Sequence, residues 1–487
     1  MKLLLKSAAQ MAFLTVLLWT CACNITVKFP PLNPKPVNLD ANAIFQDDFP
    51  FEISKQTPDP GTVIPPTRSG SVILLPAGQH NFEMKYRLLQ NASSVIKLQS
   101  YILYRDPVAL NLVKIVEGKQ KQGVNVKFIA DCYTKYITKE QIFYFDMVMQ
   151  GVDLLGFEPL YFSASEDPNA LIDVNDINMR FHEKYWLVDD YVGITGGTNI
   201  AQEYASYQND PRFLWRDQDV ILTGEVVKDM SRAFDENYVY FTKKRMNRPD
   251  PINPWFYKKE CDKHKKAKST TVKNPAGNEA PIDQILQAEG FTDVNVPVRF
   301  IRSRPRLKET YIHQAYVHLF NTAKKSILIE NSYILLDESL SKALIAAARR
   351  GVEITIVTNC EKTNDVFEMA PLTRATYLPL LEAGIKIYEW QGIVPGKGSV
   401  HAKYAVFDED ISIVGSYNLD PRSTFLNSED IVVIRSQKTA DELKRYTREI
   451  DLKYSKPVTI EMAKKFQDQR RISQIWTRFA LSFKDWW

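Results

Sequence analysis

Hydrophobic and polar positions follow the same order in two separate parts of the chain. Residues 92–103 and residues 323–335 are both rich in apolar and β-branched side chains, and both end in Ser-Tyr-Ile-Leu. Such runs are typical of β-strands. Each run leads into a stretch where apolar residues recur with the helical period, at 108–119 and at 340–350. The pattern therefore predicts a strand followed by a helix, twice.

Glycines mark the ends of these two helices. Gly123 and Gly351 follow the periodic stretches, where a helix commonly ends. Second apolar runs come next, at 124–130 and 352–358. Because a strand–helix–strand order is that of a βαβ unit, we predict an α/β fold. We expect two pseudo-twofold-related lobes, each with a mostly parallel sheet flanked by helices.

Shifts in composition divide the remainder of the chain. Nine prolines lie between residues 29 and 66, and a stretch rich in Lys, Pro and Asn separates the two repeats. In order, the predicted segments are a signal peptide or anchor (1–23), a Pro-rich spacer (24–70), a first lobe (71–247), a basic polar linker (248–285), a second lobe (286–455) and an amphipathic C-terminal helix (456–487).

Composition limits the class of protein. The 487 residues can form two sizeable cores, and a hydrophobic content of 45% is ordinary for a globular protein. A net charge of +4 is compatible with an anionic substrate but too small to indicate a nucleic-acid-binding protein. Beyond the N-terminal segment, Cys132, Cys261 and Cys360 are too few for a disulfide framework. No second metal-binding pair accompanies Cys261, so we predict no metal site.

The two ends of the chain have the features of membrane-active segments. Lys2 and Lys6 flank the start of an apolar stretch that is shorter than the roughly 20 residues of a membrane-spanning helix, as in a secretory signal peptide. Lipidation of Cys21 or Cys23, and retention as an uncleaved anchor, are both open. Aromatic and basic residues at 470–486 fit an interfacial helix or a helix docked on a lobe. We expect an exported, membrane-associated protein.

A second repeat contains side chains suited to catalysis. In both copies a histidine is followed by a lysine after two residues, an aspartate after seven, a glycine step after fourteen and an asparagine after seventeen. The members are His182, Lys184, Asp189, Gly196-Gly197 and Asn199 in the first copy, and His401, Lys403, Asp408, Gly415-Ser416 and Asn418 in the second. A single His-x-Lys could be a surface pair, whereas two copies with the same spacing indicate a site.

Strand geometry accounts for this spacing. Residues two apart on a strand share a face, so each histidine and its lysine point the same way. Asp189 and Asp408 lie an odd number of positions from their histidines, so we expect them to brace a loop. Asn199 and Asn418 return a hydrogen-bond donor to the pocket. Two copies brought together therefore predict a cationic, donor-rich pocket for one phosphate diester.

The repeated motif resembles the H-x-K-x(4)-D-x(6)-G-[GS]-x-N signature of the phospholipase D superfamily, and the resemblance covers residues 71–455. Segments 196–204 and 415–423 look like those of bacterial cardiolipin synthases. The Pro-rich spacer and the insertion at 248–285 depart from that group's pattern.

The resemblance implies a mechanism. One histidine attacks phosphorus to form a phosphohistidine, and the other protonates the departing alcohol. Lys184, Lys403, Asn199 and Asn418 would hold the non-bridging oxygens. Neither a metal nor another cofactor is implied.

A nucleophilic histidine needs a carboxylate on its other ring nitrogen. Glu429, just before an apolar strand, is our candidate partner for His401. Asp217 occupies the parallel place for His182, and Ser416 is a further supporting residue. We predict that His182 is the nucleophile and His401 the acid.

Function follows from the resemblance and from the expected location. We predict a phosphatidyltransferase that meets phosphatidylglycerol or phosphatidylethanolamine at the membrane surface, on the periplasmic side of a bacterial membrane. The alternatives are hydrolysis of phospholipid to phosphatidic acid and, less favoured, a nuclease of the same superfamily. A degenerate scaffold would not retain both sets of His, Lys and Asn.

Overall fold

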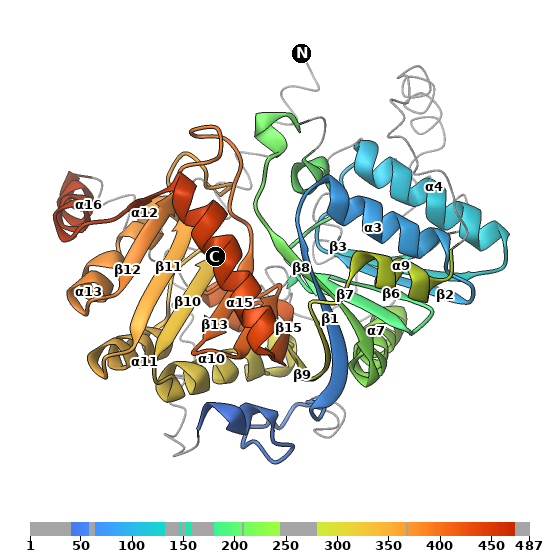
Figure 1. The fold of residues 1–487 in the computed structure, drawn as a ribbon, viewed down its shortest axis with the longest axis horizontal. Helices are drawn as coiled ribbons and strands as arrows, with labels where there is room; N and C mark the ends of the chain where they lie inside the picture. Colours follow the sequence, from blue (N-terminus) through green and yellow to red (C-terminus); the bar gives the residue numbers. More distant parts are fainter. Residues whose placement is uncertain are drawn as a thin grey trace, which may run out of the picture.

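The strands of the two halves join into one continuous sheet. The computed structural model describes residues 40–57, 64–131, 147, 152–157, 180–206, 209–243, 280–366 and 369–472. Within them, a sheet of 16 strands runs from one half through the other (Figure 1).

The first half contains β1 (Arg68–Pro76), α3 (Gln79–Gln90), β2 (Val95–Ser100), α4 (Pro107–Lys121), β3 (Asn125–Asp131), β4 (Asp153–Phe157), β5 (Arg180–Phe181), β6 (Tyr185–Val188), β7 (Val192–Gly196), η3 (Gln202–Ala205), η5 (Pro211–Phe213), β8 (Gln218–Gly224) and α7 (Glu225–Lys243).

The second half contains α9 (Ile282–Glu289), β9 (Asp293–Ser303), η6 (Pro305–Leu307), α10 (Tyr311–Thr322), β10 (Ser326–Asn331), α11 (Glu338–Arg349), β11 (Glu353–Asn359), α12 (Met369–Arg374), α13 (Tyr377–Glu382), β12 (Lys386–Trp390), β13 (Lys403–Phe407), β14 (Ile411–Gly415), α14 (Pro421–Phe425), β15 (Asn427–Arg435), α15 (Gln437–Tyr446), η7 (Thr447–Asp451), η8 (Leu452–Tyr454), β16 (Ser455–Pro457) and α16 (Ile460–Ile472).

The strand order is pseudo-symmetric about the pair β1 and β9. Outward from β1 the order is β8-β7-β6-β2-β3-β4, and outward from β9 it is β15-β14-β13-β10-β11-β12, with β16 beyond it. The α/β class and the duplicated lobes are thus confirmed. The sheet is mixed, however, where mostly parallel sheets were expected: β2–β3–β4 and β10–β11–β12 are parallel, and the strands around the dyad are antiparallel. The reason is that the motif strands are joined by short turns, which permit only antiparallel pairing.

Helix ends in the two βαβ units agree with the sequence pattern. Asp106 and Asp337 cap the N-termini of α4 and α11 by accepting hydrogen bonds from backbone N–H groups of the first turn. Gly123 and Gly351 follow these helices with the same φ of 91°, a conformation that side chains with a Cβ disfavour. The repeated glycines are therefore required by the chain reversal after each helix.

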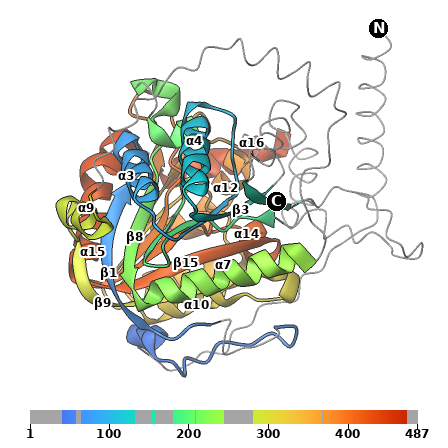
Figure 2. The ribbon, with the colours of Figure 1, turned by 90° about the vertical axis from the view of Figure 1, so that its right-hand side faces the viewer.

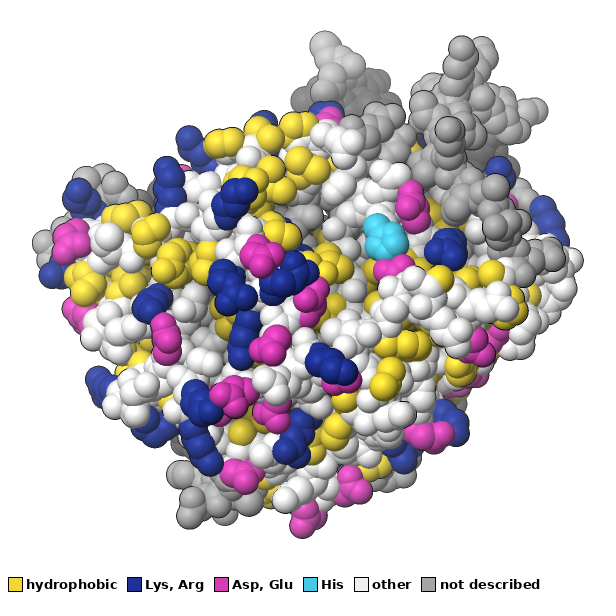
Figure 3. Space-filling view, viewed as in Figure 1, with side chains coloured by type: hydrophobic (Ala, Val, Ile, Leu, Met, Phe, Trp, Pro, Cys, Tyr) yellow, Lys and Arg dark blue, Asp and Glu magenta, His cyan; other side chains and the backbone are white. Residues whose placement is uncertain are grey.

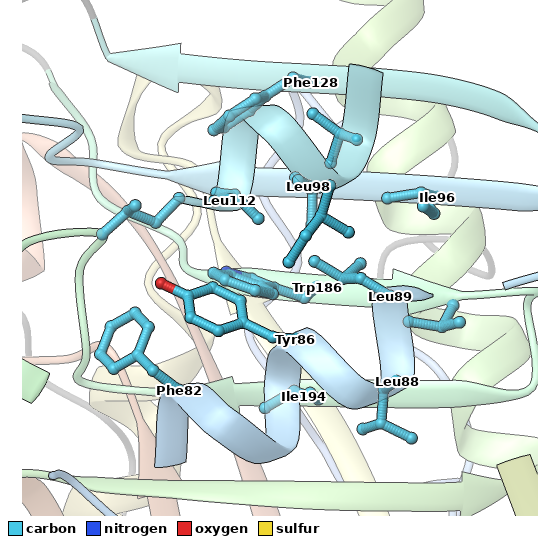
Figure 4. Packing of buried hydrophobic residues seen from close by; sticks show 14 of the residues in the cluster. Phe82, Tyr86, Leu88, Leu89, Ile96, Leu98, Leu112, Phe128, Trp186 and Ile194 are labelled. Atoms are coloured by element: carbon cyan, nitrogen blue, oxygen red, sulfur yellow. The ribbon is translucent and has the colours of Figure 1, made fainter. Parts of the chain in front are cut away.

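Three large apolar clusters and a small fourth one form among the described residues. One lies between the sheet and helices α3 and α4, where Phe82, Tyr86 and Leu112 pack over Trp186 of β6 (Figure 4). The corresponding cluster of the second half lies beneath α10 and α11. The third contains residues of α7 and α15 together with strands of both halves, including Leu187 and Tyr404. This shared cluster joins the lobes, so they cannot be treated as independent domains.

Residues 40–57 fold against the second half. The Arg299 guanidinium donates to the carbonyl oxygens of Ile44 at 2.8 Å and Gln46 at 2.6 Å, and the Phe51 ring lies 5.6 Å from that of Tyr311. Figures 1 and 2 both show this segment beneath α10. Part of the region predicted as an extended spacer is therefore a packed strap, because Ile44 and Phe51 supply apolar anchors between the prolines.

Several predicted segments fall outside the described residues. These are the N-terminal segment with Cys21 and Cys23, most of the linker, and the tail beyond α16. Among the residues that are described, no helix combines the length and apolar content that crossing a bilayer requires.

Candidate active site

Both motifs lie where the two halves meet, at the start of equivalent strands. His182 follows β5 and Lys184 precedes β6, while His401 precedes β13 and Lys403 is its first residue. All four side chains are buried, and each residue has at most 6% of its surface exposed. Burying four polar side chains has a free-energy cost unless each of them is hydrogen-bonded or paired with an opposite charge.

Each histidine is held by a carboxylate from the opposite half. Nδ1 of His182 lies 2.8 Å from Oε2 of Glu429, and Nδ1 of His401 lies 2.7 Å from Oδ2 of Asp217. The predicted pairing, Glu429 with His401 and Asp217 with His182, is therefore wrong, although all four residues do lie in one site.

Backbone contacts explain why the pairs cross between halves. β5 pairs with the start of β15 in parallel, and the His182 N–H donates to the Ser428 carbonyl at 2.9 Å. In the mirror position, Arg216 bridges to Val400, and the His401 N–H donates to the Arg216 carbonyl at 2.6 Å. Each histidine is thus hydrogen-bonded to the residue just before its carboxylate partner in the other half, Ser428 before Glu429 and Arg216 before Asp217.

The glycine steps make room for the carboxylates. A Cβ on Gly197 would lie 2.1 Å from Oδ1 of Asp217. Only glycine, which has no Cβ, avoids this clash. At the equivalent position, the Ser416 hydroxyl donates to Oε2 of Glu429 at 2.5 Å, and the Ser423 hydroxyl donates to Oε1 at 2.7 Å. Glu429 is consequently held by two hydroxyls and a histidine, and Ser416 has the supporting place that the sequence predicts.

The motif lysines add positive charge beside the histidines. Nζ of Lys184 donates to the His182 carbonyl at 2.8 Å, and Nζ of Lys403 lies 2.9 Å from Nδ1 of His401. Burial lowers the pKa of Lys184 to about 7 and that of Lys403 to about 8. Burial raises the pKa of both Asp217 and Glu429 to about 7. Burial therefore disfavours the charged form of each of these groups, and an anion bound beside the lysines would favour their charged form.

The two motifs act on each other electrostatically. Burial holds the pKa of both histidines well below its usual range, and the positive charges of Lys184 and Lys403 lower the pKa of each histidine further. A charge perturbs a pKa in this way only at short range. Because each lysine perturbs the histidine of the other half, the two copies form one site.

The two motif asparagines differ in whether their side-chain amides are already hydrogen-bonded. Asn199 already uses both ends of its amide, since Oδ1 accepts from the Ile102 N–H at 3.1 Å and Nδ2 donates to the Tyr204 hydroxyl at 2.8 Å. Oδ1 of Asn418 is buried without a hydrogen-bond partner among the described residues. The amide of Asn418 is therefore the more available to a ligand.

The motif aspartates brace loops, as strand parity predicts. Asp189 accepts hydrogen bonds from the backbone N–H groups of Ser93, Ser94 and Val95, at the start of β2. Asp408 accepts from the N–H groups of residues 324–326, at the start of β10. Both aspartates have a positive φ, 53° and 52°. They fix the hairpins that carry the motifs and do not face the site.

Aromatic side chains that the sequence analysis did not assign to the site line it. The Tyr101 ring lies 4.8 Å from His182, while Tyr204 and Trp215 lie 5.1 Å and 5.8 Å from His401. Tyr333, the repeat partner of Tyr101, donates to Asp365 at 2.8 Å. The shared Ser-Tyr-Ile-Leu sequence was a usable signal for the tyrosines at 101 and 333; no repeat marks Tyr204 and Trp215.

Within the described ranges, no group of three or more His, Cys, Asp or Glu side chains is arranged to hold a metal ion. The cations that act on His182 are Lys184, Lys403 and Arg422.

Comparisons with known proteins find relatives named cardiolipin synthase. The family model described as "Cardiolipin synthase, PLD-like domain" matches residues 316–450. A cardiolipin synthase of Geobacillus kaustophilus is 27% identical over 365 residues, which is 75% of this chain and 63% of that protein. The probable cardiolipin synthase YwiE of Bacillus subtilis is 27% identical over 74% of this chain and 61% of its own length. The chain thus matches somewhat less than two thirds of these relatives.

A solved structure shares the fold. The phosphatidylserine synthase of Haemophilus influenzae superposes with a TM-score of 0.61 over 85% of this chain and 94% of its own, at 12% sequence identity. At this identity the likeness establishes the fold alone.

Proposed function

We propose that this chain is a phosphatidyltransferase of the phospholipase D superfamily, of the cardiolipin-synthase type, that works through a phosphohistidine. The observation that carries the proposal is the crossed arrangement of His182–Glu429 and His401–Asp217. Neither half contains a complete histidine–carboxylate pair, so one substrate phosphate must be bound by both.

In the first step, Nε2 of His182 attacks phosphorus while Glu429 holds Nδ1. The N–P bond forms, the bond from phosphorus to the headgroup oxygen breaks, and His401 gives its proton to that oxygen. In the second step, His401 takes the proton of an acceptor alcohol, whose oxygen bonds to phosphorus as the N–P bond breaks. Lys184 and Lys403 stabilise the negative charge on the non-bridging oxygens in both steps.

The roles of the histidines follow from their different surroundings. Besides the motif lysines, the charge of Arg422 lowers the pKa of His182, which favours a neutral nucleophile. Burial and Lys403 lower the pKa of His401 as well, but there the charge of Asp365 acts in the opposite sense, which no carboxylate among the main causes does for His182. We therefore assign attack to His182 and acid–base catalysis to His401.

Substrate and location belong to the same proposal. The comparisons support a phospholipid substrate; phosphatidylglycerol or phosphatidylethanolamine as donor, and export with attachment through the N-terminal segment, are our proposals from the sequence. A lipid hydroxyl is the acceptor that would give cardiolipin.

Product analysis tests the function. The purified full chain is incubated with phosphatidylglycerol vesicles, and lipids are identified by mass spectrometry. We expect cardiolipin and released glycerol. Phosphatidic acid as the main product would replace transfer by hydrolysis, and no lipid product together with cleavage of DNA or RNA would overturn the proposal.

A further inference from the structure

A compact turn beside His401 exposes aliphatic side chains to solvent. Residues 391–398 connect β12 to the motif, and the apex carries Ile393 and Val394, which are 43% and 39% exposed. Exposed aliphatic side chains of this size are less favourable in water than in an apolar environment. Two of them side by side at the apex of a loop are suited to contact an apolar partner.

Backbone hydrogen bonds close the turn. The Gly396 N–H donates to the Gln391 carbonyl at 2.7 Å, and the Lys397 N–H donates to the Val394 carbonyl at 2.9 Å. The Trp390 indole N–H donates to the Gly398 carbonyl at 3.2 Å, which fastens the base of the turn to β12. The exposed apex is therefore held in place by the fold.

A second segment lies against this turn and extends the apolar surface. A Cβ on Gly398 would lie 2.3 Å from the Leu214 carbonyl, so the backbones touch. Phe213, Leu214 and Trp215 are half-buried, and the Trp215 ring reaches His401. In Figure 1 the loop after β12 and helix η5 lie at the same upper edge, where Figure 3 shows yellow apolar side chains gathered beside dark blue basic ones.

Two exposed lysines at this edge are suited to contact an anionic partner. Asp210 is paired with Arg212 at 2.6 Å, and Glu361 is paired with Arg374 at 2.8 Å. Among the described residues, Lys362 and Lys397 have no ion-pair partner within 4.0 Å, and both are exposed. Lys362 contacts the turn, since its Cβ lies 3.7 Å from where a Cβ of Gly396 would be.

The geometry points to residues 211–215 and 391–398 as the edge that enters the surface of an anionic phospholipid bilayer. This inference rests on the proposed function and adds the mode of docking: Ile393 and Val394 reach the acyl boundary, the lysines contact lipid phosphates, and Trp215 leads from the interface to His401. Aliphatic apices flanked by basic side chains are typical of interfacial insertion.

Site-specific photocrosslinking in the full chain tests the docking directly. Val394 is replaced by p-benzoylphenylalanine, and the protein is irradiated on vesicles of equal parts phosphatidylglycerol and phosphatidylcholine. The matched control carries the same replacement at Val239 of α7, which is 46% exposed. We expect lipid adducts at 394 and none at 239. Equal labelling, or labelling at 239 alone, would overturn the inference.

A turnover comparison separates docking from catalysis. Ile393→Ser/Val394→Ser should lower turnover of vesicle phosphatidylglycerol about tenfold and leave turnover of a monomeric short-chain phosphatidylglycerol unchanged. The control, Val239→Ser/Val294→Ser, should change neither. Equal losses on both substrates would refute a docking role. If no substrate is turned over but adducts form at 394, the proposed function fails while the docking edge stands.

Discussion

The two halves of the active site share a backbone plan but differ in what surrounds each histidine. His182 lies beside Tyr101 and in the field of Arg422, whereas His401 lies against Tyr204 and Trp215 and in the field of Asp365. The repeat therefore gives two equivalent frames, and residues outside the motif give the two histidines different surroundings. The asymmetric reaction that we propose depends on this difference.

Removing either imidazole should have the largest effect. His182→Ala and His401→Ala should each lower kcat by about 10⁴-fold or more on phosphatidylglycerol, because attack and proton transfer act as a unit. Activity is measured by release of glycerol. A variant of either kind with substantial activity would contradict the shared site, and a phosphohistidine isolated from His182→Ala would reverse the assigned roles.

Replacing the carboxylate of each crossed pair should reveal which histidine is the nucleophile and which is the acid. Asp217→Asn and Glu429→Gln should each lower kcat on phospholipid about 100-fold, since each orients one histidine. With a p-nitrophenyl phosphodiester the leaving group of the first step needs no acid, so Asp217→Asn should slow the pre-steady-state burst of p-nitrophenolate by less than about tenfold. Glu429→Gln should still slow that burst, because nucleophilic attack is still required. The reverse ranking of the burst rates would show that His401 is the nucleophile.

Anion binding should be linked to proton uptake at both lysines. With a pKa of about 7 for Lys184 and about 8 for Lys403, these amines are partly neutral in the empty site at pH 7.5. A bound anion raises both pKa values, so protons are taken up and affinity falls as pH rises through this range.

Calorimetry with inorganic phosphate in buffers of different ionisation enthalpy measures the uptake. Lys403→Met should reduce it. Uptake that is unchanged in Lys403→Met, or proton release on binding, would contradict the perturbed lysines.

The smallest effect, on stability and not on activity, is expected from replacing the two equivalent glycines that follow α4 and α11. Gly123→Ala and Gly351→Ala should each lower the free energy of unfolding by about 1 kcal/mol, since both glycines have a φ of 91° in open space. Urea unfolding measures this cost. A large difference between the two variants would show that the repeat is not equivalent at these turns.

Local sequence determined the features that depend on spacing along one strand or helix. The order of strands and helices, the glycines after the helices, and the His-x-Lys faces all follow from periods of 2.0 and 3.6 residues. Strand parity also sufficed to predict that Asp189 and Asp408 point away from the site. In the structure they accept hydrogen bonds from backbone N–H groups at the starts of β2 and β10.

Tertiary structure alone decided which groups meet across the dyad. Glu429 and Asp217 were recognisable as candidates, but a duplicated motif offers each carboxylate two histidines, and only the pairing of β5 with β15 and of Arg216 with Val400 selects the opposite half. Tyr204 and Trp215 have no counterpart in the repeat, so only the structure shows that they lie beside His401. Periodicity fixes the direction of a side chain relative to its own backbone, whereas its partners depend on how distant segments pack.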